Sequence, residues 1–172
     1  MTDANIAAEG ATIPAGVYHE KQTLMRCGLH SVNNMLQRKA FDVSDFDTIA
    51  RSLVQVQNDA RWSFNPHQTV LGIGNYGVEV LIAALLRHGY STCYFDRRKA
   101  TDTIDLVVAV DGLLCNVPSS SMMGLWQSRH WFTIRQVHGV YYNLDSKLPA
   151  PLVQEQRMHA LLPSRMNLSP CT

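Results

Sequence analysis

The sequence has few cysteines and no two of them in a C-x-x-C arrangement. Its four cysteines, Cys27, Cys93, Cys115 and Cys171, follow no regular spacing, so the pattern predicts neither a zinc knuckle nor a disulfide framework. Cys93 and Cys115 lie in apolar, strand-like runs, where a thiol acts as a small hydrophobic side chain, and Cys171 lies near the C-terminus. We therefore expect unpaired thiols.

The sequence also has little net charge. Lysine and arginine number 15 against 14 aspartate and glutamate residues, which gives a formal charge of +1. Nucleic acids and anionic membranes attract clustered basic side chains, whose binding releases counterions. Because no basic stripe is present, we expect neither to be the main partner.

Long hydrophobic runs are absent as well. The longest apolar stretches, near 78–86 and 106–115, are interrupted by Glu79 and Asp111, and both are far shorter than the roughly 18 residues that cross a bilayer. Residues 1–16 have neither a positively charged start nor an apolar stretch of secretory length. We expect a soluble, cytoplasmic protein with no transmembrane segment, in which residues 1–16 form a flexible tail.

Helical patterns fill the first half of the chain. Apolar residues at helical spacing predict a helix over 25–37 that begins near Cys27. A second helix is expected after Ser44, which has the side chain of an N-cap. A third, over 78–89, is apolar on nearly all sides and ends at a glycine, which is typical of a buried helix packed on a sheet. Between the second and third helices, turn-rich residues predict an exposed loop.

Strand patterns follow. Apolar or alternating runs predict strands over 90–95, 103–110, 112–117, 130–137 and 140–146. The last two are joined by His138 and Gly139, a signal for a tight hairpin. After Pro149 no periodicity predicts further regular structure.

Helices followed by antiparallel strands are typical of an α+β domain, with the early helices packed on a late, mostly antiparallel sheet. We place this domain at 17–155. Residues 156–172 are expected to form an atypical and poorly ordered C-terminal segment.

Cys27 stands where a reactive thiol is expected. A cysteine attacks as the thiolate, and its ordinary pKa of about 8.5 falls at a helix N-terminus or beside an imidazolium. The predicted hairpin brings His130, at the start of one strand, next to Asp145, at the end of the other. Gln22, five positions before Cys27, has an amide that can join the Cys27 N–H in binding an oxyanion.

Each of these residues also has a structural interpretation. A cysteine at a helix start is commonly a buried thiol, and a histidine at a strand end commonly lies on the surface. His30, one helical turn after Cys27, is expected to be structural, and Trp131 either shields the site from water or belongs to the core. The other histidines, for which the sequence predicts no partner, are His19, His67, His88, His138 and His159.

Three segments resemble a known family. The strings YHEKQTLMRCGLHSVNNMLQ (18–37) and RHWFTIRQVHGVYYNLDSKLPAP (129–151) resemble the nucleophile and histidine segments of the Josephin family of deubiquitinating cysteine proteases. Between them, NPHQTVLGIGNYGVEVLIAALLRHG and YFDRR (65–98) resemble the short proteins of that family, which consist of little more than the Josephin domain.

This resemblance implies a papain-like cysteine protease fold of the Josephin type. It makes Cys27 the nucleophile, His130 the general base and acid, Asp145 the residue that orients His130, and Gln22 the oxyanion donor. The implied activity is thiol-dependent hydrolysis of the peptide or isopeptide bond after the C-terminal glycine of ubiquitin. The implied partners are ubiquitin and ubiquitinated proteins, and we expect a monomer that uses no metal or organic cofactor.

Two alternatives stay open. Josephin domains continue beyond the position of Gln154 with a further helix and a closing strand, whereas this chain continues with RMHALLPSRMNLSPCT. A catalytically weak or inactive ubiquitin-binding module is therefore one alternative, and a cysteine hydrolase of small acyl or amide substrates is another. The aromatic residues considered as ubiquitin contacts are Trp62, Phe64 and Trp126.

Overall fold

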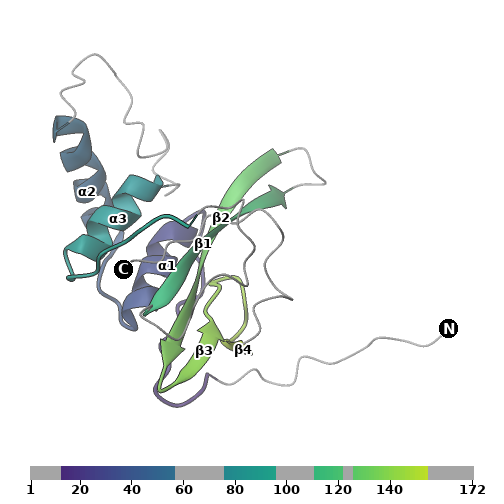
Figure 1. Cartoon of the computed structure of the whole chain (residues 1–172). Coiled ribbons are helices and arrows are strands. Elements are labelled where there is room, and N and C mark those ends of the chain that lie inside the picture. The colour runs from purple at the N-terminus through teal and green to yellow at the C-terminus, as the bar shows by residue number, and fades with distance from the viewer. Residues whose placement is uncertain (1–12, 57–75, 96–110, 122–125, 155–172) are drawn as a thin grey trace.

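The computed structural model describes residues 13–56, 76–95, 111–121 and 126–154 of the chain. Within these ranges the helices are α1 (Cys27–Leu36), α2 (Val43–Val56) and α3 (Val78–Leu86). The strands are β1 (Gly112–Ser121), β2 (Trp126–Val137), β3 (Val140–Asn143) and β4 (Leu152–Gln154). Helices precede an antiparallel sheet, so the predicted α+β class is confirmed (Figure 1).

The sheet has the simple order β1-β2-β3-β4, with each strand antiparallel to its neighbour. Strands β2 and β3 are joined by the two-residue turn at His138 and Gly139, whose φ angles of 49° and 82° are both positive. Two positive φ angles characterise the type I′ turn, whose twist matches that of the flanking strands. The predicted hairpin is therefore confirmed at the predicted residues.

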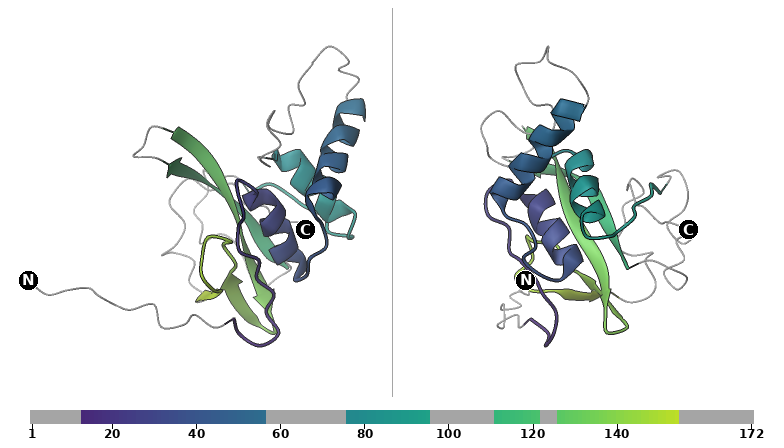
Figure 2. Two further views of the ribbon diagram at one scale, coloured as in Figure 1. Left: turned by 180° about the vertical axis from the view of Figure 1, so that it is seen from behind. Right: turned by 90° about the vertical axis from the view of Figure 1, so that its left-hand side faces the viewer.

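Helix α1 is the layer between the sheet and the other two helices. It lies against β2, while α2 and α3 lie beyond it and contact each other (Figures 1 and 2). Thr133 of β2 donates a hydrogen bond from Oγ1 to the carbonyl of Ser31 at 2.8 Å, inside this buried interface. The helix that begins with Cys27 is thus attached directly to the strand that carries His130.

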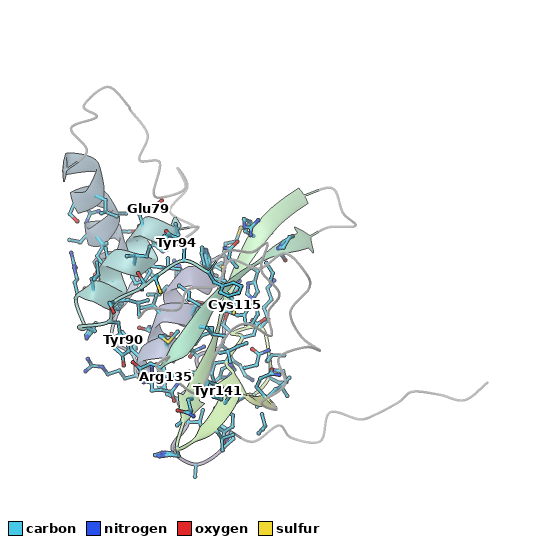
Figure 3. All side chains as sticks on the ribbon, viewed as in Figure 1. Glu79, Tyr90, Tyr94, Cys115, Arg135 and Tyr141 are labelled. Carbon is cyan, nitrogen blue, oxygen red and sulfur yellow. The ribbon has the colours of Figure 1, made fainter. Side chains whose placement is uncertain are left out.

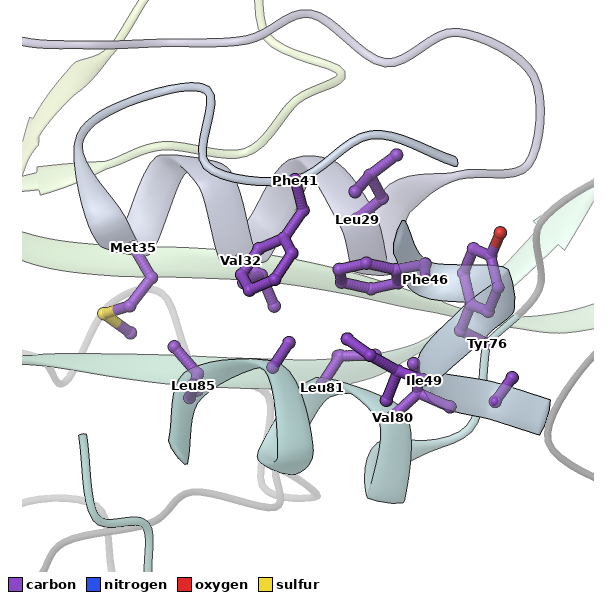
Figure 4. Close-up of a cluster of buried hydrophobic side chains, with 12 residues drawn as sticks. Leu29, Val32, Met35, Phe41, Phe46, Ile49, Tyr76, Val80, Leu81 and Leu85 are labelled. Atoms are coloured by element: carbon purple, nitrogen blue, oxygen red, sulfur yellow. The ribbon is translucent and has the colours of Figure 1, made fainter. Parts of the chain in front are cut away.

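The main hydrophobic core fills the space between the three helices. Val32 of α1, Phe46 and Ile49 of α2, and Val80 and Leu81 of α3 have no exposed surface (Figure 4). We expected α3 to pack on the sheet. Its buried side chains lie in one cluster with those of α1 and α2, and Leu114 of β1 and Trp131 of β2 also pack against this cluster. The core thus removes apolar side chains of all three helices from water beside the sheet.

A second, smaller cluster lies on the sheet itself. It includes Cys115 of β1, Ile134 of β2 and Tyr141 of β3. Elsewhere on β2, the guanidinium of Arg135 lies 5.7 Å from the ring centroid of Tyr90, where it makes a cation–π contact (Figure 3). The sheet is therefore packed by apolar side chains and also tied to the segment that follows α3.

Two local expectations were wrong for identifiable reasons. Helix α2 is capped by Asp42 rather than Ser44, since the Asp45 N–H donates to Asp42 Oδ1 at 3.0 Å and the Asp42 N–H donates back to Asp45 Oδ2 at 2.8 Å. This reciprocal pair satisfies two N–H groups that a helix start leaves free. The expected strand over 90–95 has a single bridge residue, Phe95, and the N–H of Tyr90 at its start bonds to the α3 carbonyl of Leu85 at 3.1 Å rather than to a strand.

Strand β4 was not expected, since no regular structure was predicted after Pro149. Its three residues pair with β3, with Tyr141 opposite Gln154. The predicted strand over 103–110, most of the predicted loop and the segment 156–172 lie outside the described residues, as do residues 1–12. The proposed domain limits of 17 and 155 therefore stay predictions.

Candidate active site

Cys27 is the first residue of α1 and is 6% exposed. The helix has no side-chain cap at its start and no acidic residue in its first turn, so its free N–H groups favour a negative charge there. Burial alone would raise the pKa of the Cys27 thiol, but hydrogen bonds with His130 and with the backbone of Trp131 and Gly28 outweigh burial and hold this pKa below its ordinary value. The site therefore favours a thiolate.

His130 lies on β2 between Cys27 and a carboxylate. Its Nε2 is 2.7 Å from Asp145 Oδ1, with side-chain exposures of 6% for His130 and 20% for Asp145. Burial alone would lower the pKa of His130, but the hydrogen bonds with Asp145 and Cys27 outweigh burial and raise it. Since Asp145 engages Nε2, Nδ1 is the ring nitrogen left for the Cys27 thiol.

Asp145 follows β3 in a tight turn that fixes its carboxylate. Its Oδ1 also accepts the N–H of Lys147 at 2.9 Å, and its own N–H donates to Asn143 Oδ1 at 3.0 Å. Burial acts to raise the pKa of Asp145, but the hydrogen bonds from His130 and Lys147 lower it overall. The carboxylate thus stays charged next to the imidazole and stabilises its protonated form.

Gln22 lies beside this turn. Its backbone N–H donates to the Ser146 carbonyl at 2.7 Å, and its Oε1 accepts from Ser146 Oγ at 3.4 Å. Its Nε2 donates to the carbonyl of Leu24 at 2.7 Å, which uses one of the two amide hydrogens. The second hydrogen remains for another acceptor, and among the described residues the Gln22 amide makes its hydrogen bonds with Leu24 and Ser146 rather than with Cys27.

A buried polar cluster joins residues 18–23 to α1, and the sequence analysis did not predict it. Glu20 Oε2 is 2.7 Å from His30 Nδ1, and Tyr18 and Asn33 also donate to the Glu20 carboxylate. Burial acts to raise the pKa of Glu20, but these hydrogen bonds lower it overall. Since His30 also binds the N–H of Thr23 at 3.3 Å, it has the structural role that the sequence predicted.

Other expectations about single residues need correction. His19 has a partner, because its Nε2 is 3.0 Å from the Asp145 carbonyl, and His88 has one in Arg38 at 2.9 Å. Gly28 lies close against α3, since an added Cβ would lie 3.1 Å from Leu81 Cδ1.

Several residues considered in the sequence analysis are not placed. Trp62, Phe64, His67, His159 and Cys171 lie outside the described residues, and the side chain of Trp126 is not described. Trp131 packs against the main hydrophobic core, which favours its structural interpretation.

The two thiols on α1 and β1 differ sharply in environment. Cys115 has no exposed surface, and burial raises the pKa of its thiol, with the Asp145 charge adding to the effect. Of these two thiols, Cys27 is the one that combines a lowered pKa with a histidine partner. Across the described ranges, no three His, Cys, Asp or Glu side chains gather as a metal site, and no helix there has the length and apolar character to cross a membrane.

Comparisons with known proteins match most of the chain to one family and its relatives. The model of one protein family, described as Josephin, matches residues 22–166, a range that extends past Gln154. Josephin-2 of Homo sapiens is 41% identical over 164 residues, covering 92% of this chain and 84% of that protein. The Josephin-like protein of Drosophila melanogaster is 36% identical over 164 residues, covering 91% and 72%. Ataxin-3 of Rattus norvegicus is 24% identical over 151 residues, covering 78% and 39%.

Proposed function

The chain belongs to the Josephin family, and from this premise we propose that it is a cysteine-type deubiquitinase. The observation that carries the proposal is the arrangement of Cys27, His130 and Asp145, in which the thiol has a lowered pKa and the imidazole a raised one. Opposite shifts in a neighbouring thiol and imidazole favour the thiolate–imidazolium pair that thiol proteases use.

In the proposed reaction, the Cys27 thiolate attacks the carbonyl carbon of the C-terminal glycine of ubiquitin. The resulting oxyanion binds the Cys27 N–H and the free amide hydrogen of Gln22. When the tetrahedral intermediate collapses, the C–N bond breaks and His130 gives its proton to the departing lysine amine. A water that loses its proton to His130 then attacks the thioester, which releases ubiquitin with a free carboxylate and restores the Cys27 thiolate.

Asp145 supports His130 both when the imidazolium donates a proton and when the imidazole accepts one. Its hydrogen bond to Nε2 at 2.7 Å holds the ring so that Nδ1 serves the reacting atoms. Its charge stabilises the imidazolium that exists before the leaving amine departs and again after water is deprotonated. We propose ubiquitin-modified proteins as substrates and the cytoplasm as the location, since this chemistry needs a reduced Cys27 thiol.

The test is reaction with ubiquitin that carries a thiol-reactive group at its C-terminus. We expect wild type to form a covalent adduct, Cys27→Ala to form none, and His130→Ala to react far more slowly. Cys115→Ala is the matched control, because Cys115 is a buried thiol with a raised pKa, and this variant should react as wild type does.

The alternatives are separate outcomes of the same test. A well-folded wild type that gives no adduct yet binds unmodified ubiquitin in a titration would contradict the hydrolase and support a binding module. A wild type whose Cys27 reacts with small thiol reagents but neither reacts with nor binds ubiquitin would support a hydrolase of small acyl or amide substrates.

A further inference from the structure

Two neighbouring asparagines of α1 are almost completely buried. Asn33 is 1% exposed and Asn34 is 0% exposed. Amides are seldom buried to this extent unless all their hydrogen-bonding groups are satisfied. The two amides form hydrogen bonds with different parts of the chain. Asn33 has a local role in the turn after α1, whereas Asn34 contacts segments of the proposed active site.

Asn34 joins three segments through one amide. Its Oδ1 accepts the N–H of Glu20 at 2.7 Å, and its Nδ2 donates to the Leu144 carbonyl at 2.9 Å and to the Glu20 carbonyl at 3.4 Å. Glu20 lies two residues before Gln22, Leu144 lies immediately before Asp145, and Asn34 itself lies on the helix that begins with Cys27. One buried side chain therefore touches the supports of three proposed site residues.

Only a side-chain amide at position 34 can satisfy all three of these partners, since it combines an acceptor with a donor. All three are backbone groups whose polarity is fixed, since an N–H can only donate and a carbonyl can only accept. Aspartate at position 34 would place an oxygen against the Leu144 carbonyl, and alanine would leave the partly buried N–H of Glu20 without its acceptor.

Residues 18–23 and the Asp145 turn are also bound to each other without Asn34. The Gln22 N–H donates to the Ser146 carbonyl at 2.7 Å, and His19 Nε2 lies 3.0 Å from the Asp145 carbonyl. Residues 18–23 keep other hydrogen bonds to α1, through His30 and Asn33, whereas Leu144 is bound to α1 through Asn34. Loss of the Asn34 amide would therefore release the Asp145 turn from α1 most directly. Because Gln22 is bound to Ser146 in this turn, the positions of both Asp145 and Gln22 relative to the Cys27 thiol would change.

We propose that Asn34 is a positioning residue, which fixes the distance from the Cys27 helix to both the oxyanion donor Gln22 and the orienting carboxylate Asp145. This inference rests on the proposed function for its catalytic consequence. The expected effect of Asn34 on the pKa of the Cys27 thiol follows from the positions of Cys27, His130 and Asp145, and it does not depend on the proposed function.

Asn33 supplies a matched control one position away. Its Oδ1 accepts the N–H groups of Ala40 and Phe41 at 3.1 and 3.0 Å, and its Nδ2 donates to the Phe41 carbonyl at 2.9 Å and to the Glu20 carboxylate. It thereby holds the turn after α1 and makes no contact with the 144–146 segment among the described residues. Both asparagines are equally buried, so their replacement costs comparable stability.

The experiment compares Asn34→Ala and Asn33→Ala with wild type in three measurements. Urea denaturation reports the folded fraction, iodoacetamide alkylation of Cys27 across pH reports thiolate formation, and cleavage of a fluorogenic C-terminal amide of ubiquitin gives kcat and KM. For Asn34→Ala we expect the alkylation midpoint to move to higher pH and kcat to fall at least tenfold with KM within about twofold, since a misplacement of about 1 Å costs roughly a hundredfold in rate. Asn33→Ala should lose stability but keep the alkylation midpoint and the kcat of wild type.

The outcomes are separable. The proposal would be overturned if folded Asn34→Ala had the alkylation midpoint and kcat of wild type. It would also be overturned if Asn33→Ala changed both quantities as much as Asn34→Ala does. If Asn34→Ala does not fold, the same measurements are made on Asn34→Asp, which keeps the acceptor for the Glu20 N–H. If neither variant folds while Asn33→Ala does, Asn34 has only a structural role and the proposal is wrong. If wild type does not cleave ubiquitin, the proposed function fails, and the alkylation profiles still decide whether Asn34 positions the thiol.

Discussion

Replacing Asp145 with asparagine deletes one charge from the site with little change of shape. Asp145 Oδ1 accepts both the His130 ring N–H and the Lys147 backbone N–H. These two donors hold the carbonyl oxygen of an asparagine in the same place, so the hydrogen bond to His130 survives and only its charge is lost. The variant therefore isolates the electrostatic part of the contact.

The size of the effect follows from the buried, 2.7 Å contact between His130 and Asp145. A hydrogen bond to a charged group contributes about 1.5–3 kcal/mol, against about 0.5–1.5 kcal/mol for a neutral one. Asp145→Asn should thus remove about 1–1.5 kcal/mol from the stabilisation of the imidazolium, which is roughly a tenfold change in the population of the ion pair.

The assay is kcat/KM for cleavage of ubiquitin amide across pH. The proposed reaction needs the proton on His130, and Asp145 raises the pKa of His130, so we expect wild type to keep its activity to higher pH than a variant without this charge. We expect the alkaline limb of Asp145→Asn to move to lower pH. Lys147→Ala, which keeps the backbone N–H, is the control and should leave the limb in place; coincident alkaline limbs for Asp145→Asn and wild type would refute the reasoning.

Three further predictions follow from single contacts. Gln22→Ala should lower kcat by about 10²–10³ with little change in KM, as loss of an oxyanion donor does, and an unchanged kcat would remove Gln22 from the oxyanion site. Gly28→Val should lower the free energy of unfolding by about 1–3 kcal/mol, because its side chain meets Leu81 Cδ1; urea denaturation should show partial relief when Leu81→Ala is added. The lowered pKa of Glu20 contributes stability that is present above its unfolded pKa of about 4.3 and is lost as pH falls. Glu20→Gln should therefore be less stable than wild type at pH 7 and nearly as stable at pH 3, and equal differences in urea midpoint at both pH values would contradict this.

Local signals made much of the site predictable from the sequence. The start of α1 at Cys27 follows from helical spacing, and the two-residue turn at His138 and Gly139 sets the pairing that brings His130 near Asp145. Both depend on residues close together in the chain. Their roles in catalysis stay predictions until the variants are measured.

Other features could not be predicted because their cause is distant or ambiguous. Asn34 and Leu144 lie 110 residues apart, and nothing in a buried asparagine's neighbours distinguishes it from a surface one. Asp42 and Ser44 are both good caps separated by one residue, and only the tertiary position of α2 decides between them. Strand β4 has three residues, too few for a period to be visible.

The attachment of α1 to β2 has a consequence for biosynthesis. Ser31 and Thr133, which join the two elements, are 102 residues apart in the chain, and contacts of such long sequence separation form late because the intervening loop must close first. A ribosome-bound chain that has released only its helices holds Cys27 without His130, and so lacks the hydrogen bond with His130 that helps to lower the pKa of this thiol. The proposed thiolate–imidazolium pair therefore requires that β2 and the Asp145 turn have been synthesised and have docked on α1.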